Sequence, residues 1–368
     1  DPVYDFANHQ EAEAEQGRAW QAKLKELQTK RADLQKMNKA YTGTFNQPAL
    51  TRVMYRGNPL APRDVVAPEG LSALKPLLKP LDLKPDAPER DRRIAFAKWL
   101  IDPKNPLTAR VMINRIWHYH FGRGIVATPS DFGDMGFRPT HPDLLDWLAR
   151  EFMKNGWSFK HMHRLILHSK TYRQASLPRQ DGLAKDAGSE LLWRFPPRRL
   201  EAEAIRDNML LLSGLLREKM YGPGFLLFEP NANYARNWIP KEDVEEKDFR
   251  RMVYNMRIRM EQDSVFGAFD CPDGGQSAPS RTRSTTPLQA LNLYNSSFTE
   301  KMADAFSKRL LKQTDNSSQQ ALVRGFESIF GRTPTPEESI VAAQYVKDHG
   351  LVAYCRVLFN ANEFLFMP

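Results

Sequence analysis

Two stretches of this chain concentrate the side chains that bind metals or ligands. Six of the eight histidines lie between His118 and His168, in a region that is also rich in Trp, Arg, Asn and Asp. Arginines cluster between Arg250 and Arg283, among glycines and hydroxyl residues. Imidazole is a common metal ligand, and guanidinium groups bind carboxylate, sulfate and phosphate. The residue types therefore indicate two kinds of chemistry to weigh, metal binding and anion binding.

Histidine pairs separated by one residue are the strongest candidates for a metal site. They are His118 with His120 and His161 with His163. On a strand both rings of such a pair would face one side, but the surrounding apolar spacing is helical and turns them about 200° apart. A site would then need one histidine from each of two helices and a carboxylate, such as Asp131, Asp143 or Asp146. We expect capped, stacked or solvated histidines and predict no metal.

A pocket for an anion is the second candidate. Arg257 and Arg259 share one face of a predicted strand, and Arg281 and Arg283 lie in the Gly/Ser/Thr-rich loop that follows. Guanidinium groups with nearby hydroxyls suit sulfate, carboxylate or phosphate. The alternative is that these arginines pair with acids of the protein itself. Those acids are helix carboxylates together with Asp263, Asp270 and Asp273.

A second polar pocket is predicted around the helix expected for residues 106–120. Arg110 and Asn114 are four residues apart on one face of this helix, and His141 opens the next helix. The helix dipole at that N-terminus favours the neutral form of His141. These three side chains are the alternative candidates for ligand binding.

Paired carboxylates raise the question of catalysis. Asp131 and Asp134 lie in a glycine-flanked loop, and Asp143 and Asp146 are one turn apart on a predicted helix. Glycoside hydrolysis needs two carboxylates that face a sugar, but acids at the start of a helix commonly serve its cap and dipole. The sequence contains no nucleophile-elbow, phosphate-loop, dinucleotide-binding or zinc-protease motif. Whether the chain is an enzyme, and through which catalytic residues, stays open.

The local patterns along the chain predict the elements that position these residues. They indicate a mainly α fold with a small β element and long irregular Pro/Gly-rich connections. Apolar residues at helical spacing predict several helices, one of them over 198–216; Ser158 can cap a helix, and Pro287 opens another. Alternating residues predict a strand over 252–260, and a short strand is predicted over 50–56. The predicted parts are a long charged coiled-coil-like helix (1–40), an extended Pro-rich connector (41–88), a helical core domain (89–218), an irregular insertion with one strand (219–284) and a C-terminal helical part packing on the core (285–368).

The charge and the lengths of the apolar runs indicate which kinds of partner the chain could bind. The chain has 53 Lys and Arg against 44 Asp and Glu, a net charge of +9 that allows an anionic glycan as partner. The basic residues are scattered among acids without a recognition motif, so we predict no nucleic acid. No apolar run is long enough to cross a membrane. The first residues read as the middle of a longer polypeptide.

The cysteine content excludes several other classes of protein. Two cysteines, Cys271 and Cys355, rule out a disulfide framework and a Cys-based zinc site. The c-type haem attachment motif does not occur, so this chain is predicted to hold no cofactor. One disulfide between the two cysteines stays open.

A family resemblance is carried by seven short segments. They are Arg56-Gly57-Asn58, the block 105–147, Tyr172–Ser176, Arg198–Asp207, Arg250–Tyr254, Thr285–Leu291 and Asn360–Phe364. Together these make the chain similar to the planctomycete-type domain of unknown function DUF1553. The resemblance implies export to the periplasm or cell surface, in a longer protein with a cytochrome-c-like domain and a second planctomycete-specific domain. Haem would then belong only to a preceding domain. The resemblance implies no catalytic residue.

Three functions are compatible with these observations. The first is a binding module for an anionic or polysaccharide ligand or a partner protein. The second is an enzyme module acting oxidatively or hydrolytically on polysaccharide, and the third is a purely structural assembly domain. In each case the long N-terminal helix is expected to contact the preceding part of the polypeptide or another chain.

Overall fold

The computed structural model describes residues 10–37, 45–231, 238–241, 244–259, 261, 265–272 and 274–367. Within these residues there are twelve α-helices and six strands of two to four residues, so the predicted mainly α fold is confirmed. The chain divides into two compact units, residues 1–105 and residues 106–368.

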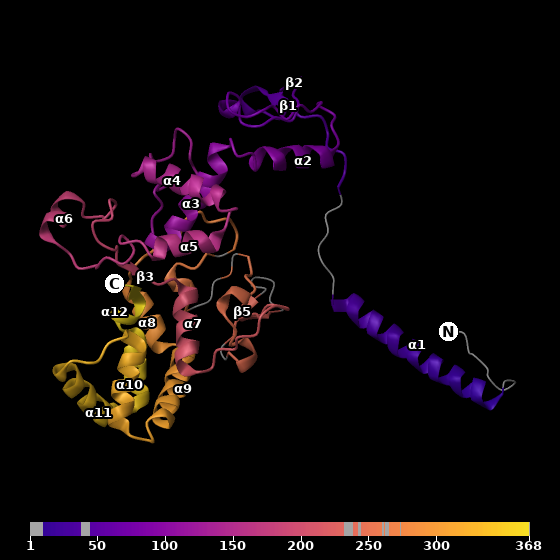
Figure 1. Cartoon of the computed structure of the whole chain (residues 1–368). Helices are drawn as coiled ribbons and strands as arrows, with labels where there is room; N and C mark the ends of the chain where they lie inside the picture. Colours follow the sequence, from indigo (N-terminus) through magenta and orange to yellow (C-terminus); the bar gives the residue numbers. More distant parts are fainter. Residues whose placement is uncertain are drawn as a thin grey trace. The chain divides into compact units, whose positions relative to one another are not determined.

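The first unit contains two helices and one small hairpin. Its elements are α1 (Glu11–Met37), β1 (Arg52–Met54), β2 (Pro62–Val65) and α2 (Glu89–Leu100), with 3-10 helices at Tyr55–Gly57 and Ser72–Leu74 (Figure 1). Strands β1 and β2 pair antiparallel, which confirms the short strand predicted over 50–56. Helix α1 confirms the long charged helix, and its Trp20, Leu24 and Leu27 side chains are exposed.

The second unit carries most of the helices. Its helices are α3 (Pro106–Phe121), α4 (Pro142–Lys154), α5 (Phe159–Leu167), α6 (Gln180–Lys185), α7 (Ala202–Ser213), α8 (Pro287–Asn295), α9 (Ser297–Gln313), α10 (Ser318–Phe330), α11 (Pro336–Asn360) and α12 (Asn362–Leu365). Its strands are β3 (Arg198–Arg199), β4 (Phe228–Pro230), β5 (Trp238–Pro240) and β6 (Phe366–Met367), with 3-10 helices at Glu246–Asp248, Met252–Tyr254 and Gly267–Phe269. Among the described residues, no helix has the length and apolar character needed to span a membrane.

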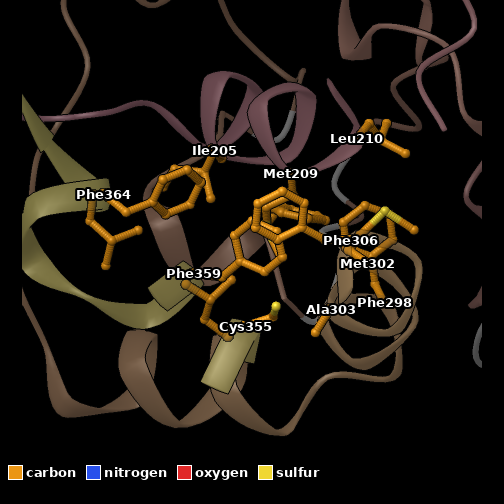
Figure 2. Close-up of a cluster of buried hydrophobic side chains, with 14 of the residues drawn as sticks. Ile205, Met209, Leu210, Phe298, Met302, Ala303, Phe306, Cys355, Phe359 and Phe364 are labelled. Atoms are coloured by element: carbon orange, nitrogen blue, oxygen red, sulfur yellow. The ribbon is translucent and has the colours of Figure 1, made fainter. Parts of the chain in front are cut away.

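The largest hydrophobic core lies where α7 packs on α9 and α11. Ile205 and Met209 are four residues apart on α7, and Met302 and Phe306 have the same spacing on α9, so each helix presents one apolar face. Figure 2 shows these side chains meeting Phe359 from α11 in the centre of the cluster. All five are buried, and burying side chains of this size contributes about 1.5–3 kcal/mol each.

A second core joins α3, α4 and α5. Ile113 and Trp117 of α3 pack with Leu148 and Phe152 of α4 and with Met162 of α5. The predicted cap Ser158 accepts a hydrogen bond from the His161 backbone amide at the start of α5. The helices predicted from the apolar spacing of these three segments are therefore confirmed.

The helix predicted over 198–216 is wrong at its start. Arg198 and Arg199 are extended and pair, as β3, with Met367 and Phe366 of β6, and α7 begins only at Ala202. The Leu200 amide also donates to the Leu365 carbonyl. Backbone pairing with the distant C-terminal segment outweighs the local helical preference of these residues.

The strand predicted over 252–260 is also wrong. Met252–Tyr254 forms a 3-10 turn, and Asn255 makes a single bridge to Phe225. The Met252 amide is taken by the Asp207 carboxylate rather than by a neighbouring strand. Alternating polarity needs an adjacent strand to become a ladder, and among the described residues none lies alongside this segment.

One buried arginine connects α7 to this irregular segment. Arg206 is fully buried, and its guanidinium donates to the carbonyls of Asp248 and Arg250, each at 2.8 Å. The rings of Phe225 and Phe298 lie within 5.0 Å and 5.4 Å of its guanidinium carbon. A charge taken out of water persists only when hydrogen bonds replace its solvation, so these contacts hold the segment in place.

We expect Arg206→Ala to lower the free energy of unfolding by about 3 kcal/mol or more, because two buried carbonyls lose their donor and the core gains a cavity. Urea denaturation followed by circular dichroism measures the change. Arg217→Ala is the matched control, since Arg217 pairs with Glu246 on the surface and should cost under about 1 kcal/mol. Equal losses in the two variants would contradict the anchoring role of Arg206.

Candidate functional site

The candidate site lies at the C-terminal end of α3, where β3 and the loop before α8 reach it. We call Arg198, Arg283 and His118 the arginine site. Gly122 follows α3 with a φ of +83°, and a Cβ built on it would lie 2.8 Å from Arg283 Nη1 and 3.4 Å from Arg198 Cδ. A glycine here both ends the helix in a left-handed conformation and leaves room for the two guanidinium side chains.

Three neighbouring arginines already have carboxylate partners. Arg281 binds Glu203 through Nη1 at 2.6 Å and Nη2 at 3.0 Å, and Arg257 Nη2 reaches the same carboxylate at 3.2 Å. Arg199 Nη2 lies 2.6 Å from Asp270 Oδ2. Burial works to raise the pKa of Glu203, but the hydrogen bonds and charge of Arg281 outweigh it and hold the pKa below its usual range. These charges are neutralised inside the protein.

Arg283 and Arg198 differ from their neighbours because neither forms an ion pair within the described chain. Arg283 makes no hydrogen bond there, and its Nε is buried without a partner. Arg198 donates to the Tyr119 carbonyl at 2.8 Å and contacts the Met367 sulfur at 3.7 Å. Burial and the charge of Arg283 lower the pKa of Arg198. A desolvated guanidinium without a counter-ion is costly, so the site is electrostatically incomplete.

The end of α3 supplies part of the missing negative charge. A helix C-terminus carries about half a negative elementary charge, and Arg198 meets it by donating to the Tyr119 carbonyl. Two guanidinium groups carry more positive charge than this dipole offsets. The remainder favours an external anion.

His118 is the third member of the site. It is half-buried, and burial, followed by the positive charges of Arg283 and Arg198, lowers its pKa, while Glu201 opposes the shift. Its imidazole is therefore neutral at pH 7 in the absence of a ligand. A neutral ring can donate one hydrogen bond and accept another.

The four arginines predicted for anion binding do not lie together in the structure. Arg257 and Arg281 converge on Glu203, whereas Arg283 lies at the end of α3. Arg259 is exposed, away from these carboxylates. The proposed partner Asp270 binds Arg199 instead, and Asp263 and Asp273 lie outside the described residues.

The alternative polar pocket has its side chains engaged within the protein. Arg110 binds Asp146 through two bonds, at 2.6 Å and 2.9 Å. Buried Asn114 exchanges two hydrogen bonds with the Val126 backbone, at 2.8 Å and 2.9 Å. His141 Nδ1 lies 2.9 Å from the Thr140 hydroxyl. These contacts organise α3, α4 and the loop between them.

The histidine pairs separate as helical geometry requires. His120 Nε2 lies 2.8 Å from His163 Nδ1, so one histidine from each of α3 and α5 does meet. His161 instead contacts Glu151 at 3.3 Å, and His118 belongs to the arginine site. In the part of the chain that is described, no three His, Cys, Asp or Glu side chains gather to hold a metal.

The candidate carboxylates are placed apart from the arginine site. Asp131 accepts a hydrogen bond from the Gly133 amide within its own loop, and Asp146 is held by Arg110. Asp143 lies in the first turn of α4. Asp134 is exposed in the glycine-flanked loop.

Sequence reasoning missed Arg198 and the proximity of His118 to Arg198 and Arg283. Arg198 was placed inside a predicted helix, and only its pairing with β6 turns it toward the end of α3. His118 was weighed only as a metal ligand. The one sequence signal for the arginine site is Gly122. A glycine there indicates the end of a helix, but it does not indicate which side chains pack against that end.

Both cysteines are free and buried, which answers the open question of a disulfide. Cys271 lies beside Glu203 and receives a hydrogen bond from Arg257. Burial, then the charge of Glu203, raises the pKa of Cys271 to about 11. Burial raises the pKa of Cys355, in the main core, to about 12.

We expect neither thiol of the folded protein to react appreciably with Ellman's reagent at pH 8, because the thiolate is the reactive form and both groups stay protonated and buried. The measurement is absorbance over time, with and without denaturant. Two thiols per chain should react once the chain is unfolded. Fast modification of either cysteine under native conditions would contradict the arrangement.

Comparison with known proteins places the chain in a family. No curated protein and no solved structure matches it. The profile of a family described as a protein of unknown function, DUF1553, matches residues 92–346, which is more than half of the chain. The match includes every residue of the arginine site. The chain therefore belongs to the DUF1553 family.

Proposed function

We propose that this domain binds an oxyanion at the arginine site. The observation that carries the proposal is Arg283, whose part-buried guanidinium forms neither an ion pair nor a hydrogen bond with any residue that the structure describes. Structural arginines elsewhere in the unit do find carboxylates or carbonyls, as Arg281 and Arg206 show. An anion between Arg283 and Arg198 would complete the missing contacts.

The charge balance around α7 favours the same conclusion. Among the described residues near the first turn of α7, the five arginines are Arg198, Arg199, Arg257, Arg281 and Arg283, and the three carboxylates are Glu201, Glu203 and Asp270. Two positive charges are left over, which suits a carboxylate or sulfate group. Such groups occur on acidic polysaccharides, and the family resemblance supports a setting outside the cell within a longer polypeptide. We propose an exported module for an anionic glycan.

The enzyme alternative has less support from the geometry. Glu203, on which two arginines of this region converge, is poorly suited to act as a general acid, because Arg281 and Arg257 bind it and keep it ionised. General acid catalysis needs a carboxyl group that holds a proton near neutral pH. Binding is therefore the function that the site supports best.

We expect sodium sulfate to raise the melting temperature of the protein by roughly 5 °C at about a hundredfold excess over Kd, because it binds only the folded state. Arg283→Gln should remove most of this rise, since it deletes the unpaired charge and leaves the fold intact. A thermal-shift titration against sodium chloride of equal ionic strength separates binding from screening.

Arg259→Gln is the matched control, because it removes the same charge from an exposed position of the same segment. The control variant should respond to sulfate as the unaltered protein does. If both variants keep the full rise, or if chloride produces it equally, the protein does not bind oxyanions at the arginine site.

A further inference from the structure

We propose that the arginine site takes up a proton together with its anion, and that His118 is the group that accepts the proton. This inference rests on the proposed function, because it describes how the same site responds to its ligand. It adds a regulatory property, namely anion capture that strengthens as pH falls.

The geometry puts His118 beside the proposed anion. Gly122, the residue that follows α3, lies four positions after His118, and its amide donates to the His118 carbonyl at 2.7 Å. Residues four apart share a face of a helix, and Arg283 Nη1 lies over that face at Gly122. An anion that binds Arg283 is therefore within electrostatic reach of the imidazole.

Three charged groups act on the His118 ring, and one aromatic ring contacts it. Arg283 comes from the loop before α8, Arg198 from β3, and Glu201 from the residue before α7. On α3 itself, the Tyr119 ring lies edge-on with its centroid 5.6 Å away. Two cations thus outweigh one carboxylate around a half-buried imidazole.

This balance keeps His118 neutral in the empty site. Burial and the two arginines hold its pKa below the ordinary histidine value, so the ring is unprotonated at neutral pH. A bound anion offsets the charge of both arginines and faces the ring directly. The bound state therefore has the higher pKa at His118, and a protonated ring adds a second N–H donor for the anion.

The direction of the pH dependence follows from this difference. At a pH between the free and the bound pKa of His118, binding takes up a proton, and affinity falls by up to about tenfold for each unit that pH rises. Below the free pKa the ring is protonated in both states and the dependence disappears. Above the bound pKa it is neutral in both states, and affinity is again constant.

Isothermal titration with sulfate tests the inference. Sulfate does not titrate near neutral pH, so proton uptake comes from the protein. Titrations at pH 6.5 in Mes, Pipes and imidazole, which differ in ionisation enthalpy, give the number of protons bound per sulfate. We expect a clear fraction of one proton in the unaltered protein and almost none in His118→Gln, which should still bind sulfate. His349→Gln, in α11, is the matched control and should keep the uptake.

The possible results separate this inference from the proposed function. If sulfate binds through Arg283 but His118→Gln takes up as many protons as the unaltered protein, the proton-linked mechanism is overturned and anion binding stands. If the unaltered protein does not bind sulfate, the proposed function fails and the linkage fails with it.

A measurement without ligand guards against a His118 variant that does not fold. The histidine ring protons can be titrated by NMR in the unaltered protein and in Arg283→Gln. Removing the Arg283 charge should raise the pKa of His118. An unchanged His118 titration would show that the two groups are not coupled and would overturn the inference.

Discussion

The second unit depends on one buried charge. Arg206 lies in the middle of α7, and its buried guanidinium donates to the backbone of Asp248 and Arg250 and lies 3.7 Å from the Asp207 carboxylate. A guanidinium in the core is tolerated only with its donors satisfied, so the irregular segment that follows α7 must take the path that brings these carbonyls to it. This long segment without regular structure is thereby held against a helix.

Helix α7 contributes both to the main core and to the ion pairs near the arginine site. Its apolar face packs in the core, and its first turn binds arginines. Ile205 and Met209 face α9 and α11 in the main core, which fixes the position of the helix (Figure 2). Glu203, in its first turn, then meets Arg257 and Arg281 from two other segments. An acid at a helix N-terminus is favoured by the dipole, so α7 binds these two arginines and leaves Arg283 without a carboxylate.

The arginine site is therefore what remains after the internal charges have found partners. Its two guanidinium groups lie at the C-terminal end of α3. The negative end of the helix dipole lowers the electrostatic cost of their charges there but does not neutralise them. The half-buried His118 is exposed to the same uncompensated field. An anion bound between these guanidinium groups would offset their charge, which is the physical basis of the binding function that we propose.

Local patterns in the sequence determined much of the helical architecture. Apolar spacing located α3, α4 and α5, and Ser158 and Thr286 cap α5 and α8 as hydroxyl residues do before a helix. The concentration of arginines from 250 to 283 predicted an anion pocket, and the structure brings two of them, Arg257 and Arg281, onto the Glu203 carboxylate. These features are legible because periodicity and capping involve residues only a few positions apart.

Only the tertiary structure decided which charges stay unpaired. Arg198 reaches α3 because β3 pairs with β6, well over a hundred residues away, and this overrides its local helical preference. Arg281 meets Glu203, which lies 78 residues earlier, while Arg283 forms no ion pair with any acid that the structure describes. Ion pairing depends on distances of a few ångströms between segments that the core brings together, and sequence spacing carries no measure of those distances.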